Sequence, residues 1–176
     1  MDRNEHPSLS KLIGILQAAY SGELAAAMAY NGHWRSLRDT ADRKRIQEIE
    51  SEELEHRRLV GELLSQLQSA PNPHLEKKMA RIGWWISLSC RVSGWFIPMY
   101  GAGKLESGNI KEYEDAAQFA NECGHSEMIE CLLEMAEVEW EHEKFFREKI
   151  EHHFLYNVFP KWTIPPPKSS IRKACL

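Results

Sequence analysis

The chain has 176 residues, which is enough for one domain with a sizeable core and too few for two ordinary domains. Hydrophobic residues make up 43% of it and charged residues 27%, a balance that excludes a disordered or low-complexity chain. The formal net charge of -4 provides no basic surface, so nucleic acid is not expected as a partner.

Apolar residues recur at helical spacing in four long stretches, which short polar or Pro/Gly-rich segments separate. In chain order, these stretches cover residues 8–37, 41–67, 73–120 and 126–154. The third stretch contains Pro98, followed closely by two glycines, and this combination predicts a kink or a break at that point.

The remaining segment, residues 157–176, is rich in proline and is expected to be extended, either lying on the surface or trailing free. No stretch alternates polar and apolar residues as a strand would. Long helices with short connections predict an all-α fold, an antiparallel four-helix bundle over residues 8–156 with a kinked or broken third helix.

The N-terminal residues do not form a secretory signal, and the cysteines show no Cys-x-x-Cys pair and no zinc-ligand spacing. We therefore expect reduced thiols in a cytoplasmic protein, either free or peripheral on the cytoplasmic face of the membrane. The cysteines are Cys90, Cys123, Cys131 and Cys175.

Each predicted helix has an apolar stripe that a carboxylate interrupts near its centre, and in two helices a histidine follows three residues later. Several carboxylates in one core need compensating positive charge, and the neighbouring stripe residues include no Lys or Arg. Oxygen ligands with two imidazoles suit iron or manganese, and Glu-x-x-His places both side chains on one helix face. This ligand set is that of ferritin-like di-iron bundles. The candidate ligands are Glu23, Glu53, His56, Glu106, Glu139 and His142.

Other acidic residues near these motifs are expected to play no direct part in metal binding. Glu122 and His125 match Glu-x-x-His but lie at a Gly-containing helix junction, so we expect them not to bind metal. Glu50 is in line with the second-helix motif and is expected to be an outer or surface group. The middle glutamates of the two Glu-x-Glu-His strings, Glu55 and Glu141, are expected to be solvated.

Further strings accompany these candidate ligands. The first helix carries Gly-Glu-Leu-Ala-Ala at 22–26 and Tyr-Asn-Gly-His at 30–33, and in the third stretch Tyr113 follows Glu106 by seven residues. Together with the two Glu-x-x-His motifs, residues 10–155 resemble the demethoxyubiquinone hydroxylase family, ferritin-like enzymes of ubiquinone biosynthesis. The resemblance implies that the six candidate ligands hold two iron ions, with manganese as the alternative. It also implies a role for Tyr113 beside the substrate channel.

The chain departs from the family pattern at two places. Ala19-Tyr20 stands where the family has Asp-His, and Glu112 stands where the family has a His before the third-helix Tyr. Groups around the ligands tune a metal site, so these changes bear on access of the reductant or the quinone. The chain would then be a divergent member of the family.

Residues 82–103 carry one charge, Arg91, and an excess of large aromatic side chains. Their number would suit a transmembrane helix, but Arg91 near the middle, several serines and Pro98 argue against one. An ordinary core helix explains the inner stripe but not the remaining aromatics. We expect a surface that contacts membrane lipid or is buried in a homo-oligomer, a dimer or larger. In the resembled family this region contacts membrane and admits a lipophilic quinone.

These observations predict an O2-dependent di-iron oxidoreductase, most simply a monooxygenase that hydroxylates a quinone precursor. Electrons would come from an external reductant, because no Gly-rich nucleotide-binding turn is visible. Two alternatives stay open from the sequence. One is a ferritin-like protein that oxidises and stores iron without an organic substrate, and the other is a metal-free structural bundle.

Overall fold

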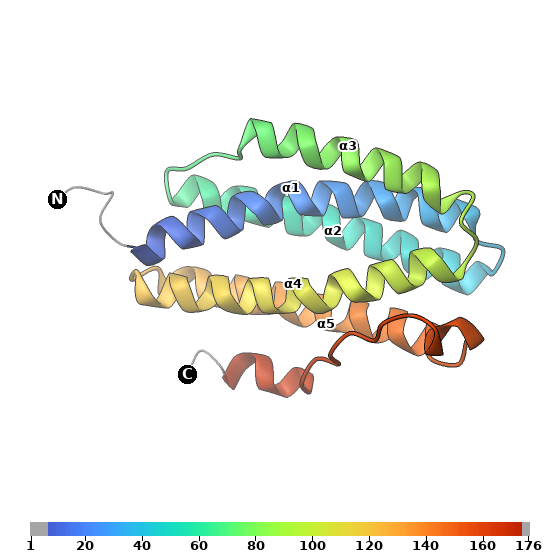
Figure 1. The fold of residues 1–176 in the computed structure, drawn as a ribbon. Coiled ribbons are helices and arrows are strands. Elements are labelled where there is room, and N and C mark those ends of the chain that lie inside the picture. Colours follow the sequence, from blue (N-terminus) through green and yellow to red (C-terminus); the bar gives the residue numbers. More distant parts are fainter. Residues whose placement is uncertain (1–6, 174–176) are drawn as a thin grey trace. The chain divides into compact units, whose positions relative to one another are not determined.

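The computed structural model describes residues 7–173 and contains only helices and irregular segments over that range, so the predicted all-α class is confirmed (Figure 1). Five α-helices follow one another along the chain, with three short 3-10 helices after the fourth. Their bounds are α1 Pro7–Ser36, α2 Thr40–Gln66, α3 Pro73–Cys90, α4 Phe96–Glu122, η1 Ser126–Met128, α5 Ile129–Ile150, η2 Phe154–Asn157 and η3 Lys168–Lys173. Cys175 lies outside the described residues.

Side-chain caps explain where two of the helices begin. The carboxylate of Asp39 accepts a hydrogen bond from the backbone N–H of Asp42 at 2.9 Å and so caps α2. The side chain of Asn72 accepts from the backbone N–H groups of His74 and Leu75, and Pro73 supplies the first residue of α3. Both starts match the predicted stretches.

The predicted third helix is in fact two helices, and the predicted position of the break is wrong. The chain leaves the helical path between Cys90 and Phe96, where Gly94 adopts φ 76°, a conformation that favours glycine. Pro98 lies in the first turn of α4, where its missing N–H costs no hydrogen bond. Gly101 and Gly103 continue the helix without interruption.

The chain divides into two compact units. The first, called here the α1–α3 unit, is Leu16–Pro98; the second, the α4–α5 unit, joins Met1–Ile15 to Met99–Leu176. Each has its own apolar core of fully buried side chains. In the α1–α3 unit these include Leu16, Ile46, Ile49, Val60 and Leu64; in the α4–α5 unit they include Met99, Leu132, Met135, Phe146 and Ile150.

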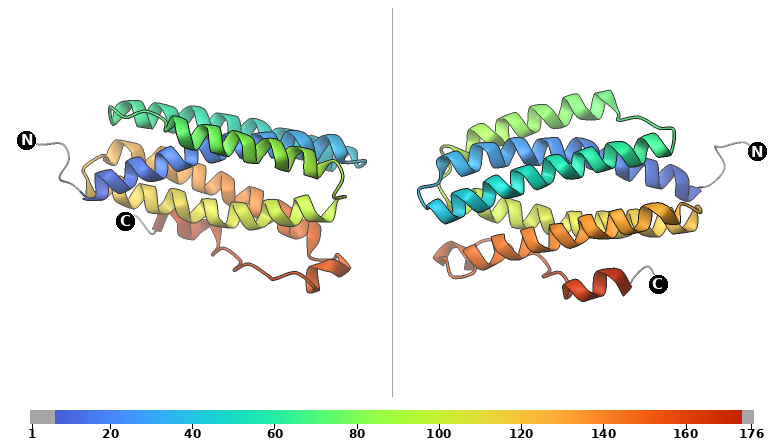
Figure 2. Two further views of the ribbon diagram at one scale, coloured as in Figure 1. Left: turned by 45° about the horizontal axis from the view of Figure 1, so that its top comes forward. Right: turned by 180° about the vertical axis from the view of Figure 1, so that it is seen from behind.

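Within the α1–α3 unit, α3 lies directly against α1 (Figure 2). A Cβ placed on Gly32 would lie 2.2 Å from the backbone oxygen of Ser87, and one on Gly83 would lie 2.7 Å from the Cα of Ala25. Both glycines therefore permit backbone-to-backbone contact. Arg57 of α2 adds a link, because its guanidinium lies 3.7 Å from the Tyr20 ring and pairs with Glu76 of α3.

Within the α4–α5 unit, the proline-rich C-terminal segment packs along the two helices rather than trailing free. Ile171 is 2% exposed, so the segment also contributes to the core. The sequence left open whether this segment lies on the surface or trails free. In the structure it lies on the surface of its unit.

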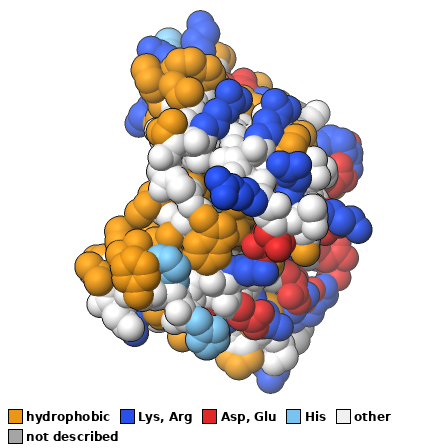
Figure 3. Space-filling view, turned by 90° about the vertical axis from the view of Figure 1, so that its right-hand side faces the viewer, with side chains coloured by type: hydrophobic (Ala, Val, Ile, Leu, Met, Phe, Trp, Pro, Cys, Tyr) orange, Lys and Arg blue, Asp and Glu red, His pale blue; other side chains and the backbone are white. Residues whose placement is uncertain are grey.

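Two of the five large aromatic side chains of residues 82–103 are exposed on the surface of α3. Trp84 is 52% exposed and Trp85 is 60% exposed, whereas Phe96 is buried at the start of α4. Figure 3 shows hydrophobic side chains beside Lys and Arg at the top of the molecule, over α3. Among residues 7–173, the one helix long and apolar enough to cross a membrane is α1, a criterion that core helices also meet.

Candidate metal centre

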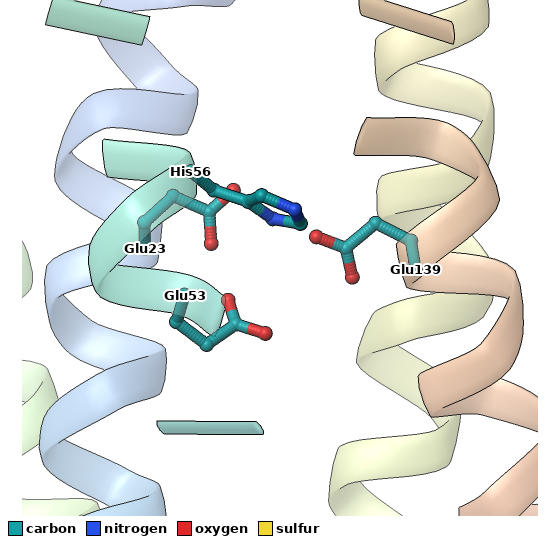
Figure 4. A group of neighbouring side chains, drawn as sticks. All are labelled: Glu23, Glu53, His56 and Glu139. Carbon is teal, nitrogen blue, oxygen red and sulfur yellow. The ribbon is translucent and has the colours of Figure 1, made fainter. Parts of the chain in front are cut away.

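The α1–α3 unit brings together three of the six candidate ligands (Figure 4). Glu23 comes from α1, and Glu53 and His56 come from α2, one helical turn apart on the same face. Each offers a ligand atom, and these atoms lie within 4.8 Å of one another. The residues are 3%, 0% and 4% exposed, so bulk water hardly reaches them.

The α4–α5 unit brings together the other three. Glu106 comes from α4, and Glu139 and His142 come from α5; their ligand atoms also lie within 4.8 Å of one another, and none of the three is exposed. The Nδ1 atom of His142 is 3.6 Å from Glu139 Oε2. The side-chain amide of Asn109 donates a hydrogen bond to Glu106 Oε2 at 2.9 Å and so orients that carboxylate.

The chemistry of these two triads fits a divalent metal ion. Each triad presents two carboxylates and one imidazole, so with a neutral histidine its two negative charges balance one divalent cation. Buried carboxylates without such a charge are costly. Three protein ligands would leave further coordination positions of such an ion open. Each unit can therefore hold a metal ion in a protected position.

The residues that sequence reasoning set aside as non-ligands lie outside both triads. Glu122 is exposed and accepts a hydrogen bond from the hydroxyl of Ser8 at 2.6 Å, and His125 pairs with Glu127 at 2.9 Å. Glu55 is exposed as predicted and pairs with Arg58; this guanidinium lowers the pKa of Glu55.

Glu50 and Glu141 are half-buried, and both have partners. Glu50 accepts hydrogen bonds from Asn31 Nδ2 at 2.8 Å and from Trp34 Nε1 at 2.6 Å, so it is an outer group held in place by α1. Glu141 pairs with Lys168 at 3.0 Å. Its side chain is still 45% exposed, although the C-terminal segment covers part of α5.

Sequence reasoning missed two residues beside the α4–α5 triad. Asn109 follows Glu106 by three residues, a spacing that places it on the same side of α4. Glu143 is fully buried and accepts hydrogen bonds from Arg147 Nε at 3.0 Å and Trp162 Nε1 at 2.9 Å. Its position four residues after Glu139 was an available signal, whereas the long-range partner Trp162 was not.

A groove of about 470 Å³ lies among α1, α2 and α3. Its walls are largely apolar, and polar groups from Asn31, Glu50 and Arg91 enter it. Leu24 and Leu54 line it, and each directly follows a candidate ligand in the sequence. The groove is thus large enough for a small apolar molecule. Two of its lining residues are sequence neighbours of ligands in the α1–α3 triad.

Two groups outside the triads have a perturbed pKa. Burial lowers the pKa of His33 to about 4, so this histidine, 1% exposed on α1, is neutral at pH 7. Burial raises the pKa of the Cys90 thiol to about 11, which makes it a poor nucleophile.

Tyr113 is 1% exposed on α4, seven residues after Glu106, and so lies on the same side of that helix.

No known protein family, curated protein or solved structure matches the chain. The two triads and their surroundings therefore carry the evidence for its function.

Proposed function

We propose that the chain is an O2-dependent oxidoreductase in which the two triads together hold a pair of iron ions. The observation that carries this proposal is the double occurrence of two carboxylates and one imidazole, buried to 4% exposure or less. In this proposal α1, α2, α4 and α5 form a ferritin-like four-helix bundle, the arrangement in which such ligand sets hold two metal ions.

Charge supports two ions rather than one. Four carboxylates from the two triads balance two divalent cations, whereas a single ion would leave an excess of buried negative charge. Bound iron would supply the one-electron chemistry that O2 reduction requires. The protein holds the ions, fixes their ligands by contacts such as that of Asn109 with Glu106, and keeps bulk water from the centre. Manganese fits the same donor atoms.

A lipophilic substrate is the second part of the proposal. The apolar groove of the α1–α3 unit offers space for a ring with an apolar tail, and its lining residues Leu24 and Leu54 adjoin Glu23 and Glu53 in the chain. A quinone precursor, hydroxylated on its ring, has this chemistry. Tyr113 is proposed to act beside the centre, where its buried hydroxyl can donate a hydrogen bond to the reacting group. Electrons would come from a separate reductant.

The exposed face of α3 supports access from a lipid bilayer. Trp85 and Leu88 are exposed there, and Val92 is exposed just after the helix ends. Lys77, Lys78 and Arg81 are exposed one to two turns earlier on the helix. Aromatic and aliphatic groups beside basic residues suit the surface of an anionic bilayer. We propose that α3 contacts such a surface; burial against a second copy of the chain is the competing outcome.

Anaerobic loading with Fe(II) tests the metal proposal. About two irons per chain are expected. After oxidation, two ferric ions with a shared bridging ligand couple antiferromagnetically and give no ferric EPR signal, whereas isolated ions give one. Glu53→Gln should lose iron, and Glu55→Gln, which changes an exposed glutamate of the same helix, should not. Less than about one iron per chain would contradict the proposal.

The substrate needs a separate measurement. Mass spectrometry of quinone intermediates in cells with and without this gene should show that a precursor accumulates in its absence. An unchanged quinone profile, together with O2 consumption that depends on Fe(II) alone, would replace the hydroxylase with a ferroxidase that has no organic substrate. The metal centre would be retained in that case.

A further inference from the structure

We propose that Trp162 is a positioning residue for the α4–α5 half of the metal centre. In this proposal the C-terminal strap, defined here as residues 159–173, fixes α4 and α5 in the arrangement that the Glu106, Glu139 and His142 triad requires. The inference rests on the proposed metal function and extends it to a segment with no candidate ligand.

The strap is held along its whole length by hydrogen bonds and ion pairs to α4 and α5. Near its start, the hydroxyl of Tyr100 donates to the carbonyl of Pro160 at 2.6 Å. In its middle, the indole of Trp140 donates to the carbonyl of Pro166 at 2.8 Å. At its end, Arg172 pairs with Glu130 at 2.7 Å. A segment with this many fixed points has a defined register on the two helices.

Trp162 contacts both helices at once. A Cβ placed on Gly103 of α4 would lie 2.8 Å from Trp162 Cζ2 and 3.0 Å from the Cβ of Phe146 on α5. The indole therefore lies on bare α4 backbone at Gly103, where α5 is also close. Its N–H donates to Glu143 Oε1 of α5 at 2.9 Å.

These contacts fall at the level of the ligands. Gly103 precedes Glu106 by one helical turn, and Glu143 directly follows His142 and is one turn after Glu139. A shift of the indole would therefore be felt by both helices within a turn of the donor atoms. Two other strap anchors, Trp140 and Glu141, also lie near the ligands, but both are only half-buried, whereas Glu143 is fully buried.

The indole N–H of Trp162 matters because it donates a hydrogen bond to Glu143. Its carboxylate is fully buried, and Arg147 and Trp162 both donate to it. Loss of the indole donor would leave a buried carboxylate under-satisfied, and it would have to change rotamer or admit water. Because Glu143 adjoins His142 in the chain, this rearrangement would disturb the imidazole that must meet the metal. Groups that orient ligands in this way affect metal affinity by about 10- to 100-fold.

Co(II) titration of the full-length apoprotein tests the inference, because the visible absorption of Co(II) reports both affinity and coordination geometry. Trp162→Phe keeps an aromatic ring but removes the N–H, and should weaken Co(II) binding about 10-fold or more and alter the absorption bands. Gly103→Ala should act in the same direction by displacing the indole. The matched control is Arg172→Gln, which loosens the strap at its end and should leave affinity and spectrum unchanged.

Thermal unfolding of each apoprotein shows that a variant is folded before its Co(II) binding is compared. If Trp162→Phe and Gly103→Ala bind Co(II) with the affinity and spectrum of the unmodified chain, the inference is overturned, whatever their stability. If Arg172→Gln weakens binding as strongly as they do, the effect belongs to the strap as a whole and the role assigned to Trp162 is wrong. If the unmodified chain binds no metal, the proposed function itself fails.

Discussion

Replacing Glu53 by Gln should have opposite effects on stability in the metal-free and the metal-loaded protein. Glu53 is fully buried, and its ligand atom lies within 4.8 Å of those of Glu23 and His56. Two ionised carboxylates no more than 4.8 Å apart would repel each other by about 3.5 kcal/mol or more at an effective dielectric constant of about 20. Gln has nearly the same shape but no charge, so the substitution removes this repulsion.

The metal reverses the order of stability. A ligand that binds only the folded chain stabilises it by about 2.7 kcal/mol when its free concentration is 100 times the dissociation constant. Loss of one of three protein ligands in the triad should remove most of that gain. Without metal, Glu53→Gln is therefore expected to be more stable than the unmodified chain by about 3.5 kcal/mol. With saturating metal, it should be the less stable of the two.

Urea denaturation followed by circular dichroism measures the free energy of unfolding of each chain. The measurement is made on the chelator-treated protein and on the Co(II)-saturated protein. Glu55→Gln on the same helix is the control, because Glu55 is exposed and should not affect the response to Co(II). The reasoning is refuted if Glu53→Gln is destabilised without metal and is still stabilised by Co(II) as much as the unmodified chain. That result would mean that Glu53 serves the packing of α2 and not a metal.

Three further predictions concern α1 and α3. Gly32→Ala should lower the free energy of unfolding by about 1–3 kcal/mol or more, because its Cβ would lie 2.2 Å from the Ser87 backbone oxygen. Gly14 has open space around it, so Gly14→Ala should raise the free energy of unfolding by about 0.5–1 kcal/mol. Equal urea midpoints for the two variants would contradict this prediction. Burial holds the pKa of His33 at about 4, below its value of 6.5 in the unfolded chain. Between these pH values only the unfolded chain binds the extra proton. The free energy of unfolding should therefore fall by about 3 kcal/mol as the pH drops from 6.5 to 4. His33→Leu should show a shallower loss over that range, and an unchanged acid limb in urea denaturation would refute the assignment. Trp85→Ser should reduce the fraction of protein that sediments with vesicles of anionic phospholipid. Membrane contact would be refuted if the unmodified chain does not bind such vesicles and instead dimerises through α3.

The helices and the burial of the candidate ligands were largely predictable from local periodicity. Glu53 and His56 are three residues apart on an otherwise apolar stripe, and so are Glu139 and His142. A charged residue at the centre of such a stripe must be buried if the stripe is buried, since helix geometry fixes the side to which it points. All six candidate ligands are indeed 4% exposed or less.

The break between α3 and α4 was misplaced because apolar spacing continues across it. Pro98 was the more visible signal, yet a proline in the first helical turn is compatible with the helix that follows. The turn depends instead on Gly94, whose positive φ is a property of the folded backbone. Val92 is 84% exposed because it lies in this break.

The C-terminal strap could not be predicted, because none of its contacts is local. Trp162 meets Glu143 across 19 residues, and Arg172 meets Glu130 across 42. A proline-rich segment has no helical period that would point one face toward a core. Its register depends on which partners α4 and α5 present, and that information exists only after the two helices have packed.

The two triads place a constraint on the fold that explains several of its other features. Buried carboxylates weaken the metal-free protein, so the surrounding helices must be held by contacts that do not depend on the metal. In the α1–α3 unit, the close approach of α3 at Gly32 and the link from Tyr20 through Arg57 to Glu76 serve this purpose. In the α4–α5 unit, the strap does the same. Each unit therefore keeps its triad in place by fastening a further segment across the outside of the helices that carry it.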